Sequence, residues 1–550
     1  MEESSNFVET IIKEDIRGQV YGDGIATRFP PEPNGFLHLG HAKSICLNFG
    51  LASKYNGSVN LRFDDTNPDR ENSSYIDAIK EDIFWLGYGW DGEFYASDYF
   101  ETLYGFAVEL IKRGLAYVDD STSEEIAEQK GTPQVPGVAN RYRERTVDEN
   151  IQLLEAMKLG RFGDGEKVLR AKIDMAAANM HMRDPIMYRV KHTPHHRTGS
   201  TWCIYPMYDF AHGQSDAIEH ITHSTCTLEF VAHRPLYNWF IEQLGLFPSK
   251  QIEFARLNLT YTIMSKRKLQ QLVEKGLVDG WDDPRLPTIA GLRRRGYTSQ
   301  SIREFCDRIG VAKRDALTDY SLLEFCVRED LNQSAQRRIA VIKPLKVIIT
   351  NYDEAETEYI AMENLPGDET KGSRKLPFGK ELWIEQDDFM EHPAKKYFRL
   401  TLGGAVRLKG AYIISCEHLV KDTHENIIEL HCRYFPESKS GNDQSNIKVK
   451  STIHWLSVQF SVPAEIRLYD KLFNVEDPGQ TGDDFLHHFN KDSIQVLQNA
   501  YVEPGLLKGD DVGIPFQFIR LGYFIKDRHS TVEHLIFNRT VDLKERWKKT

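Results

Sequence analysis

Hydrophobic and polar positions follow two different patterns along the chain, and the change lies near residue 340. Before it, short extended runs such as 59–63 alternate with helical patterns such as 75–86 and 99–112. This alternation predicts an α/β core over most of the region before residue 340. Within that region, 284–330 has apolar residues at three- and four-residue intervals, so we predict that it is mostly helical.

After residue 340 the pattern becomes one of alternating apolar and polar residues, in short runs separated by Gly, Asn, Asp and Pro. Alternation with a period of two is typical of strands, and many short strands with polar turns indicate β-barrels. Segments 130–140 and 362–380 are rich in Gly, Pro and charged residues, and we predict loops there.

Composition excludes several classes of protein. The 81 acidic and 69 basic side chains leave a formal net charge of −12, so any polyanion must bind to a local basic surface. A hydrophobic content of 41% excludes a wholly disordered chain. The seven cysteines form no CxxC pair, which favours a reducing compartment. Because residues 1–18 lack the features of a secretory signal and no apolar run is long enough to span a bilayer, we expect a cytoplasmic protein without a membrane segment.

The most informative motif is His38-Leu39-Gly40-His41, which follows a proline-rich stretch. The prolines end a predicted strand, and a helix is expected to begin near His41 with amide groups that favour a phosphate. His38 and His41 can face the same ligand, while Gly40 leaves space for a flat base against the backbone. Taken alone, such a pair is more often two surface histidines at a helix start.

A second motif strengthens the first. PEPNGFLHLGH resembles the HIGH motif of class I aminoacyl-tRNA synthetases, and Ile263-Met264-Ser265-Lys266-Arg267 resembles their KMSKS loop. Ile263 replaces the usual first lysine and Arg267 the final serine, which leaves Lys266 as the phosphate-binding lysine of the loop. The resemblance to the glutaminyl-tRNA synthetase family covers almost the whole chain and includes LRFDDTNP at 61–68, CIYPMYDF at 203–210, SDAIEHITHSTCTLEF at 215–230 and GWDDPRLPTIAGLRRRGY at 280–297.

This resemblance implies a fold and a set of domains. The expected fold is α/β, with a Rossmann-type nucleotide-binding catalytic domain, an inserted acceptor-binding domain, a helical subdomain and two C-terminal β-barrels. The short segment before the first strand leads us to expect the bacterial-type arrangement, and the family expectation is a monomer. The expected boundaries are 1–100 and 208–260 for the catalytic domain, 101–207 for the inserted domain, 261–338 for the MSKRK loop and helical subdomain, and 339–550 for the anticodon-binding barrels.

The implied activity is the activation of glutamine with ATP to glutaminyl-adenylate, followed by transfer to the terminal ribose of tRNA(Gln). Attack of a carboxylate on the α-phosphate builds charge on phosphate oxygens, so the protein mainly positions groups and stabilises charge. His38, His41 and Lys266 are the expected catalytic residues, and Mg²⁺ is expected only through ATP. The expected ATP-binding residues are Glu32, Pro33, Asn34, His38, Leu39, Gly40, His41, Ala42, Lys43, Ser44, Thr227, Arg256, Leu257, Met264, Ser265 and Lys266.

Five residues are implied to bind glutamine, namely Arg28, Asp64, Tyr208, Cys226 and Gln251. Asp64 would take the ammonium group, Tyr208 would offer a hydroxyl, and Arg28 would stabilise carboxylate charge. Without the resemblance, Asp64 is more simply part of a strand-end turn, since DDTNP is rich in turn formers. Related glutamate enzymes tend to have arginine in place of Cys226, and an arginine would favour glutamate. Glutamate stays the alternative substrate, and Cys226 can also be a small buried residue.

Contacts with tRNA are expected at several places. Arg337, Arg399, Gln517 and Arg520 align with anticodon-contacting positions, and guanidinium and amide groups suit unstacked bases. Basic clusters within 141–145, 191–197 and 293–295 suggest a surface that follows phosphates, although each cluster alone is more often a solvated face. We assign no residue to recognition of the tRNA acceptor stem, because Val231-Ala232-His233 stands where close relatives often carry an acidic residue.

Three other interpretations were weighed against this one. His220, His223 and Cys226 have a spacing that places three metal ligands on one helix face, but no fourth ligand is evident, so we do not expect zinc. A nucleotidyltransferase without an RNA substrate shares HxGH chemistry, but the large β-rich C-terminal half argues against it. A catalytically idle RNA-binding scaffold is disfavoured by the intact motif residues.

Overall fold

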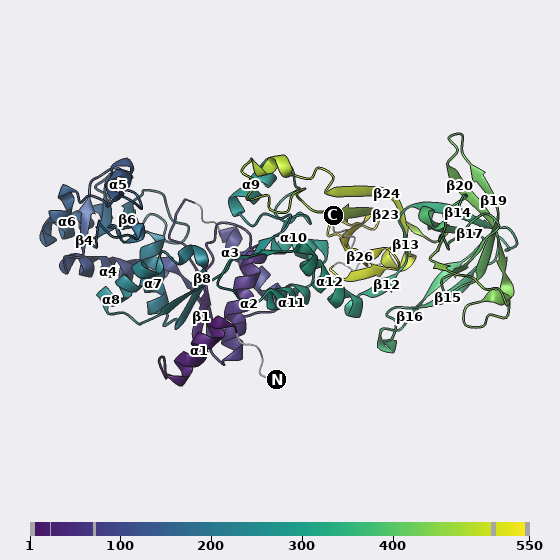
Figure 1. Ribbon diagram of the computed structural model, residues 1–550, viewed down its shortest axis with the longest axis horizontal. Helices are drawn as coiled ribbons and strands as arrows, with labels where there is room; N and C mark the ends of the chain where they lie inside the picture. The colour runs from purple at the N-terminus through teal and green to yellow at the C-terminus, as the bar shows by residue number, and fades with distance from the viewer. Residues whose placement is uncertain (1–5, 23, 70–72, 508–512, 545–550) are drawn as a thin grey trace. The chain divides into compact units, whose positions relative to one another are not determined.

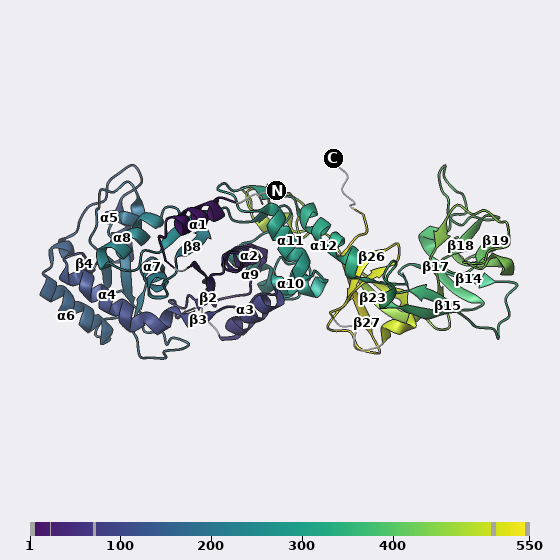
Figure 2. The same cartoon turned by 90° about the horizontal axis from the view of Figure 1, so that it is seen from below.

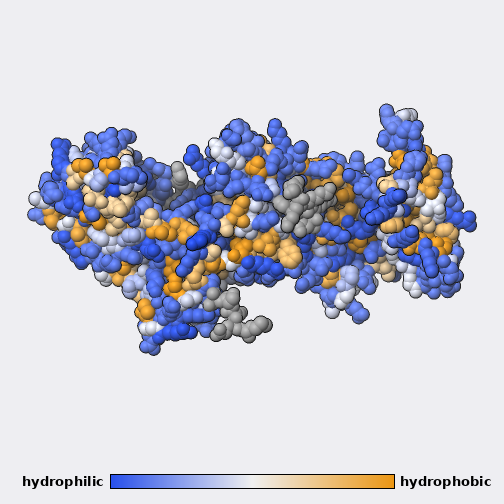
Figure 3. Space-filling model, viewed as in Figure 1, coloured by the Kyte–Doolittle hydropathy of each residue, from blue (hydrophilic) through white to orange (hydrophobic). Residues whose placement is uncertain are grey.

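The computed structural model describes residues 6–22, 24–69, 73–507 and 513–544. The chain divides into two compact units, Met1–Asn258 with Cys306–Thr318 and Leu259–Phe305 with Asp319–Thr550. In the part of the chain that is described, no helix is both long and apolar enough to cross a membrane. Hydrophilic residues cover most of the face seen in Figure 3, with hydrophobic ones in small groups between them.

A parallel β-sheet forms the centre of the first unit (Figure 1). β1 pairs with β2 and β2 with β3, while β8 pairs with β9. The two groups lie side by side, because the Thr222 N–H donates to the Ala26 carbonyl at 3.0 Å. The strand at 59–63 is confirmed as part of β2. The strands are β1 (Ala26–Phe29), β2 (Ser58–Phe63), β3 (Gly92–Tyr95), β8 (His223–Thr227) and β9 (Lys250–Phe254).

Helices pack on this sheet through apolar side chains. Val8 and Ile12 of the first helix, Leu47 and Leu51 of the second and Phe254 of β9 belong to one buried cluster. Burial of such side chains is the main stabilising contribution to this packing. The helices of this part are α1 (Phe7–Arg17), α2 (Leu39–Lys54), α3 (Ser73–Trp85), α7 (Tyr208–Ile218) and α8 (Arg234–Leu244), and α3 confirms the helical pattern at 75–86.

A second sheet in the first unit is antiparallel, with the order β4-β5-β6-β7. Leu103, Leu110 and Leu154 on its helices share a buried core with Leu169 and Met187 on its strands. Its strands are β4 (Ala116–Asp119), β5 (Val168–Ala171), β6 (Ile186–Val190) and β7 (Ile204–Pro206), and its helices are α4 (Phe100–Lys112), α5 (Ser123–Lys130) and α6 (Val147–Lys158). The predicted helix at 99–112 is therefore confirmed as α4.

Helices also dominate the stretch of chain that follows β9 and precedes the C-terminal strands. Thr288 caps one of them by accepting a hydrogen bond from the Gly291 N–H at 3.1 Å, and Gly296 ends it with a left-handed conformation at φ 96°. The helices are α9 (Lys266–Glu274), α10 (Ile289–Arg295), α11 (Ser299–Ile309) and α12 (Tyr320–Ser334), which confirms the prediction for 284–330.

Two seven-stranded, barrel-like sheets lie in the second unit and confirm the predicted β-barrels (Figure 2). Each encloses its own apolar core, one around Trp455 and Val347 and the other around Phe516 and Phe537. The first sheet contains β14 (Pro344–Ile349), β17 (Glu381–Glu385), β18 (Ala405–Leu408), β19 (Ile413–Lys421), β20 (Ile427–Phe435), β21 (Thr452–Ile453) and β22 (Leu456–Ser457). The second contains β12 (Gln336–Arg338), β13 (Ala340–Val341), β23 (Val462–Tyr469), β24 (Ile494–Val502), β25 (Pro515–Phe518), β26 (Gly522–Lys526) and β27 (Leu535–Val541).

The loop predicted at 362–380 is confirmed only for 364–372 and is wrong for the strand residues on either side. This segment contains most of an antiparallel hairpin, β15 (Glu358–Glu363) with β16 (Ser373–Phe378). Ile360, Leu376 and Phe378 point into the core of the first sheet, whereas the charged and glycine-rich residues belong to the turn between the strands. Because the turn is rich in Gly and charged residues, the alternation of apolar and polar residues in the two flanking strands was not recognised. At 130–140 the chain is irregular beyond the end of α5, as predicted.

Candidate active site

The two motif histidines form the start of α2 and hold each other in place. His38 is the N-cap residue, and its Nδ1 accepts a hydrogen bond from the Gly40 N–H at 3.1 Å. His41 reaches back, so that its Nδ1 accepts a hydrogen bond from the His38 N–H at 3.1 Å. This reciprocal arrangement is a capping box built from two imidazoles, with ring centroids 3.9 Å apart.

The arrangement explains the glycine between the histidines. A Cβ at position 40 would lie 2.9 Å from Cε1 of His38 and 3.0 Å from its Nδ1, closer than nonbonded atoms approach. Burial, and secondly the neighbouring His41, lowers the pKa of His38 well below its usual value. A neutral His38 can accept the Gly40 N–H and offer its second nitrogen to a ligand.

The expected ATP-binding residues of the first unit gather at one edge of the parallel sheet. The histidine motif follows the carboxyl end of β1, Thr227 ends β8, and Arg256 and Leu257 come directly after β9. Ligands of open parallel sheets bind at this edge. Of the other residues expected here, Glu32 is exposed and Pro33 is buried, while Asn34 and Ser44 are half-buried.

Lys43 joins α2 to the segment after β9 inside the protein. Its side chain is buried, and Nζ donates to the Ala255 carbonyl at 2.8 Å. Burial lowers the pKa of Lys43 below its usual value. Lys43 therefore ties α2 to the segment after β9, next to Arg256, whose guanidinium pairs with Glu229 at 2.8 Å.

Arg28 lies in a fully buried ionic network beneath this edge. Its Nε pairs with Asp216 Oδ1 at 3.0 Å, and Arg62 Nη1 pairs with the same oxygen at 2.8 Å. Arg28 also donates to Ser224 Oγ at 2.7 Å and to the Thr225 carbonyl at 2.8 Å. Burial opposes the charge of Asp216, but the two arginines outweigh it and hold its pKa well below the usual range. The guanidinium of Arg28 is thus held by protein groups, and Asp216, together with Glu219, which pairs with Arg62 at 3.1 Å, balances the charges of the two arginines.

The other expected glutamine-binding residues surround this network. Asp64 follows β2 and is buried, and its N–H donates to the Pro31 carbonyl at 3.0 Å, which joins it to the loop before the histidine motif. Tyr208 begins α7 and stacks on His212 with ring centroids 4.9 Å apart. Burial raises the pKa of Tyr208 well above its usual value, so its hydroxyl stays protonated.

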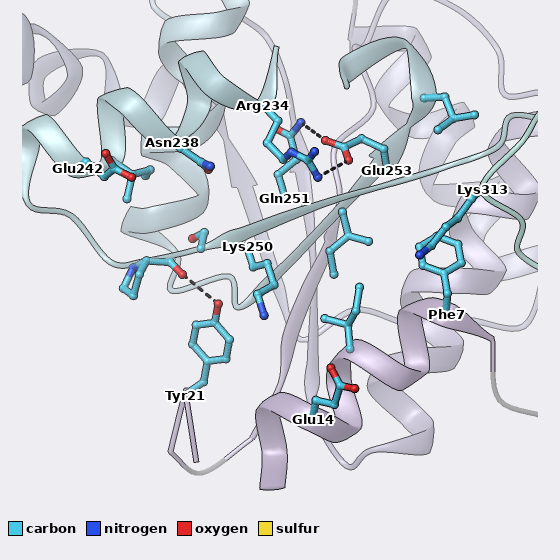
Figure 4. A pocket seen from close by; sticks show the side chains of 16 residues that line it. Phe7, Glu14, Tyr21, Arg234, Asn238, Glu242, Lys250, Gln251, Glu253 and Lys313 are labelled. Carbon is cyan, nitrogen blue, oxygen red and sulfur yellow. Dashed lines mark hydrogen bonds and ion pairs between the residues drawn. The ribbon is translucent and has the colours of Figure 1, made fainter. Parts of the chain in front are cut away.

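Cys226 and Gln251 lie on neighbouring parallel strands. The register pairs Ser224 with Gln251 and Cys226 with Glu253, so these four side chains lie on one face of the sheet. Burial raises the pKa of Cys226 to about 12, which leaves a neutral thiol. Gln251 is buried and also lines a cavity of about 810 Å³ between α1, α8 and β9 (Figure 4).

The second motif belongs to the second unit. Ser265 occupies the N-cap position of α9 without a side-chain capping bond, and Lys266 is the first residue of that helix. Ile263 is buried with Leu269 and Phe485. Met264 is half-buried between these anchored residues. That Lys266 joins the two histidines at one ATP molecule stays a prediction.

The four expected anticodon residues form two pairs in the second unit. Arg337 and Gln517 are register partners on β12 and β25, and Gln517 Nε2 donates to the Tyr523 hydroxyl at 2.9 Å. Arg399 and Arg520 instead share a buried carboxylate, since each guanidinium contacts Asp388, at 3.1 and 2.6 Å. The Arg399 side chain is 43% exposed, which leaves it accessible to a ligand.

Comparison with known proteins places these sites in a family. A family model described as tRNA synthetases class I (E and Q), catalytic domain, matches residues 24–333. Two models described as tRNA synthetases class I (E and Q), anti-codon binding domain, match 335–435 and 452–527. The chain belongs to the class I tRNA synthetases for E and Q. The family and the fold inferred from the sequence are therefore confirmed.

Relatives of this synthetase chain match nearly its whole length. Glutamine--tRNA ligase of Rhodopirellula baltica is 55% identical over 99% of this chain and 91% of its own. Glutamine--tRNA ligase of Clostridium kluyveri is 54% identical over 99% of this chain and 98% of its own. A solved glutamate-tRNA synthetase of Elizabethkingia anophelis is 19% identical and covers 57% of this chain and 72% of that chain, with a TM-score of 0.43.

The basic clusters of this synthetase chain are partly engaged in the fold, at one or more residues of each, while Arg141, His192 and Arg197 are exposed. His195 is buried, and its Nε2 lies 2.7 Å from the Asp65 carbonyl. In the other two clusters, Arg143 pairs with the buried Asp184 at 2.7 Å and Arg294 with the buried Asp527 at 3.0 Å. Arg143 and Arg294 stabilise the fold, because each neutralises a carboxylate that is removed from water.

Among the described residues, two groups of side chains lie close enough to hold a metal ion, namely Asp65 with His195 and His196, and Asp209 with His181 and His233. The segment with His220, His223 and Cys226 is not helical as considered, because 223–227 is strand β8, so these residues share no helix face. His181, Asp209 and His233 do come together, but Nδ1 of His233 lies only 2.6 Å from Asp209 Oδ1. Two ligands of a tetrahedral zinc ion lie about 3.3 Å apart. As it stands, this group is a hydrogen-bonded pair with a neighbouring imidazole.

Sequence reasoning missed the groups that support the expected site. Asp216, Arg62 and Glu253 had no role in it, although each directly contacts an expected glutamine-binding residue or its partner. Arginine within an apolar strand, as in Asn60-Leu61-Arg62-Phe63, was the available signal, since a buried arginine requires a buried acid.

Proposed function

We propose that this chain activates glutamine with ATP to glutaminyl-adenylate and transfers the glutaminyl group to the terminal ribose of tRNA(Gln). One observation carries this proposal: the histidine motif, Asp64, Thr227 and Arg256 follow or end four strands at the same edge of a parallel sheet. Identities of 54–55% to glutamine--tRNA ligases over 99% of the chain support the substrate.

For the activation step, His38, His41 and Lys266 would bind the triphosphate and stabilise charge on its oxygens. Met264 and Ser265 would position the loop that carries Lys266. Mg²⁺ would enter bound to ATP, where it neutralises phosphate charge, and the chain needs no ligand set of its own for it. The remaining proposed ATP contacts are Glu32, Pro33, Asn34, Leu39, Gly40, Ala42, Lys43, Ser44, Thr227, Arg256 and Leu257.

For glutamine, Asp64 would bind the ammonium group and Tyr208 would offer its protonated hydroxyl. Arg28 would act on the substrate carboxylate through its own guanidinium, since Asp216 and Glu219 balance the charges of Arg28 and Arg62 within the network. The neutral thiol of Cys226 and the amide of Gln251 provide no cation for a substrate carboxylate. This neutrality favours glutamine over glutamate, because an unpaired carboxylate is costly to remove from water.

The rest of the chain would bind tRNA. We assign 101–207 to the acceptor end and 339–550 to the anticodon, with Arg337, Arg399, Gln517 and Arg520 as base contacts. We infer a monomer that works in the cytoplasm, where translation consumes its product. The two anticodon-binding family matches argue against a nucleotidyltransferase that has no RNA substrate.

The decisive experiment is a charging assay with tRNA(Gln), in which glutamine and glutamate are compared as substrates. We expect ATP consumption that requires both glutamine and tRNA. Preferred charging with glutamate, or ATP consumption that ignores tRNA, would refute the proposal. In the same assay His41→Ala should lower adenylate formation far more than tRNA binding, and equal losses would show that the role of His41 is misassigned.

A further inference from the structure

The orientation of the Gln251 amide is determined by two neighbours. Its Nε2 donates to the Phe230 carbonyl at 3.2 Å and to Glu253 Oε1 at 3.0 Å. Both partners are pure acceptors, so only the NH₂ end of the amide satisfies them. Gln251 is 5% exposed, and a flipped amide would place its oxygen against two other oxygens in a buried position. The carbonyl oxygen must therefore face away from Phe230 and Glu253.

Glu253 is itself held in place. Its side chain is 5% exposed, and its Oε2 pairs with Arg234 Nη1 of α8 at 3.0 Å. The two carboxylate oxygens have different partners, since one binds Arg234 and the other binds Gln251 (Figure 4). Arg234 is 47% exposed and keeps its charge in water while it compensates the buried carboxylate.

We propose that Glu253 is a positioning residue for amino-acid selection, which acts through Gln251. By accepting one amide hydrogen, it presents the Gln251 carbonyl oxygen to the substrate side chain. That oxygen accepts a hydrogen bond from the NH₂ group of glutamine and repels the carboxylate of glutamate. Selectivity therefore depends on the orientation of the Gln251 amide as well as on its presence. The inference rests on the proposed function, because it takes Gln251 as a contact of the glutamine side chain.

Glu253→Gln tests this role with a side chain of the same size. A glutamine at 253 can donate to the Gln251 oxygen, so only the Phe230 carbonyl would still favour the present orientation of the Gln251 amide. We expect the ratio of kcat/KM for glutamine to that for glutamate to fall at least tenfold, about the value of one hydrogen bond to a buried group. The loss should appear in KM for glutamine, with KM for ATP unchanged. Arg234→Gln, at a half-exposed position, should change the ratio in the same direction by a smaller factor.

A matched control and a double variant separate positioning from a general structural effect. Glu242→Gln makes the same change on α8 at an exposed residue of the same cavity and should leave the ratio unchanged. If Glu253 acts only through Gln251, adding Glu253→Gln to Gln251→Ala should cause no further loss of selectivity. Additive losses, or an unchanged ratio in Glu253→Gln, would overturn the inference. A wild-type chain that prefers glutamate would instead refute the proposed function.

Discussion

Gly40→Ala is the sharpest test of the histidine arrangement. The added Cβ would lie 2.9 Å from Cε1 of His38, so the imidazole must rotate and give up the hydrogen bond that it accepts from residue 40. Loss of an N-cap costs about 0.5–2 kcal/mol. If that cost appears in the transition state for adenylate formation, the rate falls by about 2- to 30-fold, since about 1.36 kcal/mol is a factor of ten.

The assay is ATP–pyrophosphate exchange measured with glutamine and tRNA present. We expect kcat/KM for ATP to fall within that range while the dissociation constant for tRNA stays unchanged. Gly50→Ala is the matched control, because Gly50 lies in the same helix and a Cβ there meets no atom within 4 Å. That control should keep full activity and, as a helix-favouring change, gain up to about 1 kcal/mol of stability.

Two outcomes would refute this reasoning. If the Gly40→Ala variant catalysed ATP–pyrophosphate exchange at the wild-type rate, the position of the His38 ring would not matter for activation. Equal losses in Gly40→Ala and Gly50→Ala would mean that any alanine in α2 perturbs the enzyme, whatever its distance from the imidazoles.

Three further predictions follow from buried or shared charges. Asp216→Asn leaves Arg28 and Arg62 without their common carboxylate and should cost about 3–5 kcal/mol, seen as a lower Tm in calorimetry, and a wild-type Tm would contradict the network. Because burial and His41 lower the pKa of His38, its contribution to stability is present above about pH 6.5 and is lost as the pH falls. The Tm of His38→Gln should therefore decline less than the Tm of the wild type between about pH 7 and pH 5. Equal declines of the two Tm values would exclude His38 as a source of the pH dependence. Arg399→Ala should raise KM for tRNA severalfold with little change for ATP, and unchanged charging at limiting tRNA would exclude a role for Arg399 in tRNA binding.

The local sequence pattern was sufficient to predict helices and strands whose formation depends on residues close by in the chain. The period of two after residue 340 predicted β-barrels, and the spacing of apolar residues predicted α3, α4 and the helices after Leu286. The start of α2 at the histidine motif was also foreseen, because a proline-rich stretch followed by helix formers is a local signal. At 362–380 the same reasoning failed, since turn residues outnumbered the strand residues in the window that was considered.

Motifs identified the family and periodicity identified the α/β and β-rich regions, because both depend on residues at neighbouring or regularly spaced positions. Only the tertiary structure decided which charges are available to a ligand. Arg28 meets Asp216 across 188 positions, and Gln251 receives its orientation from Glu253 and from the Phe230 carbonyl of a neighbouring segment. Spacing along a chain does not specify such partners, since burial is affordable for a charge only where folding brings an opposite charge or a hydrogen-bonding group within about 3 Å.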